Sequence, residues 1–158
     1  MEKEKIIKIV DEVKSNLDTS VFAEEERKGS IGCNQFRELS SICRRAECYE
    51  EVEMLVKYNE AKAEVRNNEG QSWRKKMKNG RTLAACIIDG MQRLKNESGE
   101  DCLKDLCLYF GYLYWTARIF AADNKENQSS GQNDHNFKGG NQGAGRNINN
   151  KNGYNGRR

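Results

Sequence analysis

Residues 100–122 read EDCLKDLCLYFGYLYWTARIFAA, and this stretch decides the fold. Apolar residues recur in it every three or four positions, which is the spacing of one helix face. The stripe predicted to face the core is Leu103, Leu106, Cys107, Phe110, Leu113, Tyr114, Ala117 and Ala121. A second side carries Tyr109, Tyr112, Trp115 and Ile119. A helix that is apolar on most sides is expected to lie at the centre of a protein or to be covered by another subunit.

Four further helices are expected before this one, each from the same periodicity. Residues 3–18 repeat apolar side chains at Ile6, Val10, Val13 and Leu17, and residues 29–32 interrupt the pattern. A second helix starts at Asn34, whose side chain is suited to cap it, and a third covers residues 49–66. The fourth carries Leu83, Ile87, Met91 and Leu94, and Gly80 stands between its basic entrance and this apolar body.

These helices predict an all-α fold, a compact bundle of about five helices in residues 1–122. The absence of proline agrees, because helical bundles need no turn prolines. Residues 123–158 differ: ten are Asn and seven are Gly, and only Phe137, Ile148 and Tyr154 are large and apolar. Such a segment cannot bury enough apolar surface to offset the entropy of ordering it, so a disordered, basic C-terminal tail is expected.

The cysteines are expected to be reduced and free of metal. Cys43, Cys86 and Cys107 fall among apolar helical positions, where a thiol packs as a small hydrophobic side chain. The pairs Cys43/Cys48 and Cys102/Cys107 are each five residues apart, and no CxxC occurs, which is a poor match to a structural zinc site. The charged start Met-Glu-Lys-Glu-Lys has no apolar segment behind it, and no apolar run is long enough to span a membrane. A cytoplasmic protein without membrane contact is expected.

The sequence contains little that catalysis requires. Its one histidine, His135, lies in the predicted tail, which removes a His-dependent triad and an HExxH metal site from the folded part. The run Gly80-Arg81-Thr82 lacks the upstream glycine and the lysine of a phosphate-binding Walker loop. Acidic pairs such as Glu50/Glu51 stand at helix starts, where they match the helix dipole. We therefore expect a protein that is not an enzyme and needs no cofactor.

The strongest local signal is a basic segment, residues 62–81, with Trp73 inside it. Its basic residues are Lys62, Arg66, Arg74, Lys75, Lys76, Lys78 and Arg81, against only Glu64 and Glu69. Cations interleaved with a flat aromatic suit a phosphate backbone, where charge neutralisation provides affinity with little sequence information. Two simpler interpretations stay open: a charge run is often a solvated helix face, and Trp73 is equally suited to anchor the core. Arg44 and Arg45 are a second basic pair for the same surface.

Three features, taken in order, resemble one protein family. The second helix opens with Asn34-Gln35-Phe36-Arg37, followed by Leu39, and the third closes with Tyr58-Asn-Glu-Ala61-Lys62. The last helix is rich in aromatic residues and has a late basic residue, Arg118. Together these features resemble the small, Csm-type helical subunit of type III-A CRISPR effector complexes, over roughly residues 3–122. The chain departs from that family at Gly111-Tyr112, where the family has Glu-Ala, and in its long tail.

The resemblance implies a structural role in antiviral defence. Several copies would stack beside the backbone subunits of a ribonucleoprotein and contact the duplex of CRISPR RNA and target RNA, while other subunits carry out cleavage. The motifs carry over Arg37 and Lys62 as RNA-binding residues. Charge alone adds the candidates Arg44, Arg66, Arg74, Lys75, Lys76 and Lys78. The expected subunit interface is Tyr109, Tyr112, Trp115 and Arg118 on the last helix.

One alternative of a different class stays open. The chain would then be a helical adaptor or oligomerisation module that binds only proteins, and its basic segment would be merely solvated. The two interpretations predict different salt behaviour, because phosphate contacts weaken steeply with added salt and apolar contacts do not.

Overall fold

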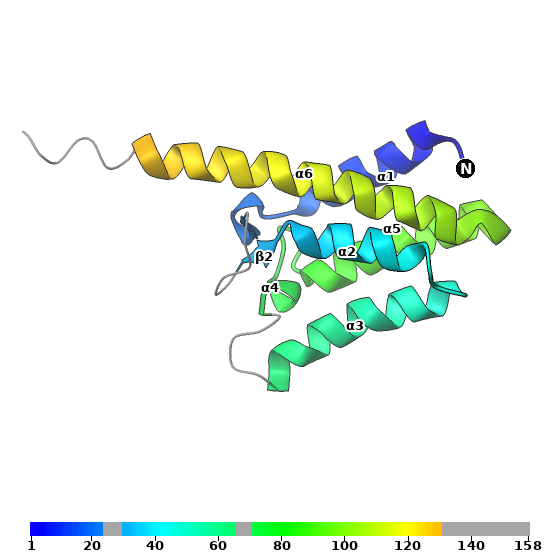
Figure 1. Cartoon of the computed structure of the whole chain (residues 1–158). Coiled ribbons are helices and arrows are strands. Elements are labelled where there is room, and N and C mark those ends of the chain that lie inside the picture. Colours follow the sequence, from blue (N-terminus) through cyan, green and yellow to red (C-terminus); the bar gives the residue numbers. More distant parts are fainter. Residues whose placement is uncertain (24–29, 66–70, 131–158) are drawn as a thin grey trace, which may run out of the picture.

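The structure is a computed structural model that describes residues 1–23, 30–65 and 71–130 (Figure 1). Helices make up most of this part of the chain: α1 (Lys3–Asn16), α2 (Asn34–Cys43), α3 (Tyr49–Val65), α4 (Gln71–Arg74), α5 (Leu83–Ser98) and α6 (Cys102–Ser130). Two short 3-10 turns, η1 (Thr19–Val21) and η2 (Gly99–Asp101), and a small parallel pair, β1 (Phe22–Ala23) and β2 (Ile31–Gly32), complete it. The predicted all-α fold is therefore confirmed.

Helix α6 is the axis on which the bundle is built, and α1, α2, α5 and β1 all pack against it. Figure 1 shows α2 running beneath α6, with α3 on the far side of α2. Helix α3 packs on α4 and α5 instead of on α6. The buried carboxylate of Asp105 in α6 lies 2.9 Å from the amino nitrogen of Met1, so this charge is paired inside the protein.

The core follows most of the predicted stripe of α6. Leu106, Phe110, Leu113, Ala117 and Ala121 are buried, whereas Leu103, Cys107 and Tyr114 are only half-buried. Tyr109, predicted to belong to a subunit interface, is fully buried instead. Its hydroxyl donates a hydrogen bond to the backbone oxygen of Ile87 at 3.2 Å, and its ring packs on Gly90 of α5. The prediction for Tyr109 is wrong because Gly90 leaves room for a ring in the core.

The fourth predicted helix is divided in two, at the place where the sequence has Gly80. One helical turn, α4, is followed by the non-helical residues 75–82, in which Gly80 has a φ of +76°. Helix α5 then begins after Thr82, whose side-chain oxygen accepts a hydrogen bond from the Ala85 amide. Asn34 is the first residue of α2 rather than its cap, and Cys33 at the cap position makes no side-chain capping bond.

Helix α6 continues beyond the predicted boundary at residue 122. Residues 123–130 are its last two turns, and the Asn124 side chain holds them to the N-terminal part of the chain. Its amide nitrogen donates to the backbone oxygens of Thr19 at 2.8 Å and Phe22 at 3.3 Å. The remaining tail residues, 131–158, lie outside the described residues, and so does His135. In the part of the chain that the structure describes, no helix has the length and apolar content needed to span a membrane.

The contact between Tyr109 and Gly90 generates a first prediction. In Gly90→Ala the new Cβ would overlap the Tyr109 hydroxyl and lie 2.9 Å from Cζ, so we expect a loss of about 1–3 kcal/mol in the free energy of unfolding. Tyr109→Phe removes a single hydrogen bond and should cost about 1 kcal/mol. In the double variant the overlap with the hydroxyl is gone, so urea unfolding should give a smaller loss than the sum of the two. A strictly additive result would contradict this packing.

Candidate nucleic-acid interface

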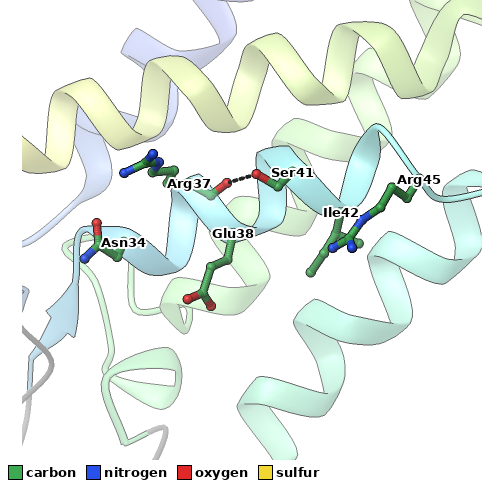
Figure 2. Close-up of a pocket in the computed structure, with 6 residues that line it drawn as sticks. All are labelled: Asn34, Arg37, Glu38, Ser41, Ile42 and Arg45. Carbon is green, nitrogen blue, oxygen red and sulfur yellow. Dashed lines mark hydrogen bonds between the residues drawn. The ribbon is translucent and has the colours of Figure 1, made fainter.

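The exposed side of α2 is a polar face with two arginines on it. Helical periodicity places Phe36, Leu39, Ser40 and Cys43 in the core, which leaves the opposite side of α2 in solvent. An open hollow of about 490 Å³ lies along this side, lined by Asn34, Arg37, Glu38, Ser41, Ile42 and Arg45. Figure 2 shows that all of these side chains come from one helix and its C-terminal turn. The two guanidinium groups stand toward opposite ends of the hollow.

Arg37 and Arg45 are exposed, and within the described residues neither guanidinium forms a salt bridge. The Ser41 hydroxyl donates to the backbone oxygen of Arg37 at 3.1 Å, so this serine is engaged with the helix itself. Glu38 is the one carboxylate among the lining residues. The hollow therefore has two cations and one anion, an excess of positive charge that favours an anionic ligand.

Arg44 lies at the seam between α2 and α6. Its Nε is 3.4 Å from the Cys107 sulfur, and the neighbouring Ser40 hydroxyl donates to the Cys107 backbone oxygen at 2.9 Å. The hydrogen bond to Cys107 raises the pKa of the Arg44 guanidinium above its usual range. Arginine is charged at every accessible pH even without this shift. Arg44 remains exposed and thus adds a third cation to α2.

Trp73 belongs to the core, as the simpler interpretation of this residue expected, and is not an exposed aromatic among the cations. Its side chain is 1% exposed, and its Nε1 donates to Gln35 Oε1 at 2.8 Å. Its ring meets Phe36 edge-on, with the centroids 6.1 Å apart. A nucleic-acid base has no access to this ring, so the predicted alternation of cations with an exposed aromatic is absent.

Lys75 has its charge satisfied within the protein. Its Nζ lies 3.2 Å from Asp18 Oδ2 and donates to the Ser20 hydroxyl at 3.0 Å. A hydrogen bond from the Ser20 hydroxyl, together with Lys75, lowers the pKa of Asp18. This ion pair fastens residues 75–82 to the segment after α1, and the Lys78 amide adds a bond to the Asn16 backbone oxygen. Lys75 therefore anchors a loop, and because Asp18 neutralises its charge we expect it to contribute little to RNA contact.

The other predicted cations lie on three different elements. Lys76 and Lys78 are exposed in the loop between α4 and α5, whereas Arg81 turns to Asp89 of α5 at 3.2 Å. Arg74 is exposed in α4, and Lys62 is half-buried near the end of α3. Arg66 lies outside the described residues. The basic run of the sequence is thus distributed over a helix end, one helical turn and a loop.

On α6, Trp115 and Arg118 are exposed and Tyr112 is half-buried, as a subunit interface would require. The rings of Tyr112 and Trp115 lie 5.5 Å apart.

Sequence reasoning did not place Arg45 with Arg37. The spacing of four between residues 37, 41 and 45 was the signal that these residues line one side of α2 and its C-terminal turn.

The cysteines form no metal centre in the part of the chain that the structure describes, since no group of three or more potential ligands occurs there. Burial raises the pKa of the Cys43 thiol to about 12, and the nearby Cys107 adds to this shift. A thiol with so high a pKa is protonated at neutral pH and is a poor nucleophile.

Comparisons with known proteins give no relative: no protein-family model matches the chain, and no curated protein or solved structure is significantly similar to it.

The ion pair of Lys75 generates a second prediction. Lys75→Gln should lower the free energy of unfolding by less than about 1 kcal/mol, because the pair is partly exposed. RNA binding should not change.

The same ion pair predicts a pH dependence of stability. Since the pKa of Asp18 is lowered on folding, the ionised Asp18 stabilises the fold above its unfolded pKa of about 3.9. This stabilisation is lost as the pH falls through the folded pKa. The stability difference between the wild type and Asp18→Asn should therefore shrink below about pH 4, as measured by urea unfolding.

Lys78→Gln is the matched control, because it removes the same charge from the same loop at a side chain that has no ion pair within the described residues. Equal loss of stability in Lys75→Gln and Lys78→Gln would contradict the anchoring role of Lys75.

Proposed function

We propose that the chain is a non-catalytic small subunit of a type III-A CRISPR effector complex. It acts in the cytoplasm in several copies, beside the backbone subunits, and contacts the phosphate backbone of the CRISPR RNA and its target. Cleavage belongs to other subunits. The observation that carries this proposal is the row of arginines on α2, which begins in the sequence motif that resembles the family.

The geometry of α2 suits phosphate contacts. Arg37 lies on α2, and Arg45 lies in the turn after its last residue, Cys43, at the other end of the hollow, so the two would contact separate phosphates. A guanidinium group presents paired donors that match a phosphate, and it keeps its charge at any physiological pH. The hollow between the two arginines is open to solvent and accommodates an extended backbone rather than an enclosed small molecule.

The proposed contact has little capacity to read bases. Gln35, the amide nearest to the motif, accepts the hydrogen bond from Trp73 and lies half-buried. Trp73 is not available for stacking. Exposed cations such as Arg37, Arg44, Arg45, Lys76 and Lys78 recognise charge instead of sequence. This property suits a subunit that must accept any guide sequence.

A second candidate function, an adaptor that binds only proteins, is favoured by a different observation. Large apolar side chains are exposed on α6, where Trp115 is 62% exposed, and on α3, where Met54 is 69% and Tyr58 is 59% exposed. Such side chains are more frequent at protein interfaces than on ordinary surfaces. The adaptor and the RNA-contacting subunit differ in whether the arginines of α2 matter for binding.

The test is binding of the full-length chain to a 30-nucleotide single-stranded RNA across a salt series. Affinity should fall with salt, and the pair Arg37→Gln and Arg45→Gln should flatten the logarithmic slope by about 1.4, because each phosphate that an arginine neutralises contributes about 0.7 to it. The matched control is the pair Lys5→Gln and Lys8→Gln, which removes equal charge from an exposed side of α1. This control should leave the slope nearly unchanged.

An equal reduction of affinity in both pairs of variants would mean diffuse attraction without a site on α2. Binding that survives in all variants and disappears only in a chain ending at residue 130 would assign RNA contact to residues 131–158. If the reconstituted effector complex also holds RNA equally well with and without the two arginines, the protein-only adaptor is the better description.

A further inference from the structure

The outward side of α6 carries an apolar stripe with one charge at each end. Its members are Lys104, Leu108, Gly111, Trp115, Ile119, Ala122 and Glu126. At 100° per residue all of them lie within about 40° of Trp115 around the helix axis. The core stripe, from Leu106 to Ala121, occupies the opposite side of the same helix. Helix α6 thus has two apolar faces, and the bundle covers only one.

The uncovered face has two large exposed apolar side chains at its centre. Trp115 is 62% and Ile119 is 61% exposed, and the Tyr112 ring supports Trp115 from the side. Successive members of the stripe are separated by 4, 3, 4, 4, 3 and 4 residues. Alternation of three and four is the pattern of a helix that packs along another helix.

The spacing of the stripe is the same in both directions from Trp115. Residues at equal distances on the two sides of Trp115 are complementary in size or in charge. Counting outward from Trp115, Gly111 corresponds to Ile119, Leu108 to Ala122, and Lys104 to Glu126. Each small residue has a large counterpart, and each charge has an opposite one. A Cβ added to Gly111 would meet no atom within 4 Å, so the helix surface is open at this position. We call this low point between the larger neighbours the notch, and a large side chain of another helix can approach the backbone there.

We propose that α6 is the interface of a two-fold symmetric dimer, in which the α6 helices of two copies pack antiparallel with Trp115 near the axis. In this register Ile119 of the partner subunit fills the notch at Gly111, and Lys104 faces Glu126 of the partner subunit. A parallel pair is disfavoured because it would place Lys104 against Lys104 and Glu126 against Glu126.

The expected affinity is modest. The stripe spans roughly 33 Å of helix, so a single helix pair forms a contact at the low end of the size of specific interfaces. Dissociation on the order of micromolar concentrations follows for such a contact. The α6 dimer rests on the proposed function in one respect only, that several copies of the chain are expected to meet. RNA takes no part in this contact.

The decisive experiment is a charge exchange, measured on the full-length chain by sedimentation across a concentration series at low salt and without RNA. Lys104→Glu and Glu126→Lys should each weaken dimerisation roughly three- to tenfold, because each creates two like-charge pairs per dimer. The double variant restores opposite charges at both ends and should recover the wild-type dissociation constant. A double variant that is as weak as the single ones would overturn the proposed register.

The notch provides a second variant that does not depend on charge. Gly111→Leu should abolish the dimer, because it occupies the space of Ile119 of the partner subunit. The monomer should melt at the same or a higher temperature, since the site is open and leucine favours a helix more than glycine does. A stable Gly111→Leu protein that still dimerises would refute the antiparallel packing.

Two further results separate the alternatives. A wild-type chain that stays monomeric at several hundred micromolar would overturn the dimer proposal. If the emission that is lost in Trp115→Phe is then typical of a covered indole, another part of the chain occupies the stripe. Loss of RNA binding in the α2 variants bears only on the proposed function, whereas loss of dimerisation bears only on the pairing.

Discussion

The whole bundle depends on the burial of one side of α6 against the other helices. Its centre is Tyr109, a large ring with a polar end, which is enclosed only because Gly90 of α5 has no side chain there and the Ile87 backbone oxygen accepts its hydroxyl. Phe110, Leu113 and Ala117 continue the same contact along α6. Because α1, α2, α5 and β1 all pack on this helix, its orientation about its own axis determines which of its residues face solvent.

That orientation also separates the two candidate surfaces. Helix α2 packs on α6, where the Ser40 hydroxyl donates to the Cys107 backbone oxygen. The buried Phe36 ring of α2 packs on Phe22 and Trp73. Because that side of α2 is buried, Arg37 and Arg45 lie on the outward side. Because the core side of α6 is buried as well, Trp115 is exposed on the opposite side of that helix. A nucleic-acid contact on α2 and a protein contact on α6 therefore do not compete for the same residues.

The helices and much of the core were predictable because both depend on local periodicity. The buried positions Leu106, Phe110 and Ala117 follow from the apolar spacing of α6 alone. The candidate site was less predictable, because a run of charged residues does not show which way each side chain points. Trp73 turns inward to Gln35, and Lys75 finds Asp18, a residue far away in the sequence. Neither partner is signalled by the segment that contains these two residues.

The sequence by itself determined that the chain is all-α, that α6 is apolar on two sides, and that Gly80 divides the region between α4 and α5, because all three are properties of neighbouring residues. Only the tertiary structure decided which aromatic residues of α6 are enclosed: Tyr109 and Trp115 are both large and apolar, but only Tyr109 meets a glycine. It also decided that Arg37 and Arg45 share one hollow and that Lys75 is paired. The physical reason is that burial and ion pairing depend on what another segment places opposite a side chain, and that is fixed by packing between helices.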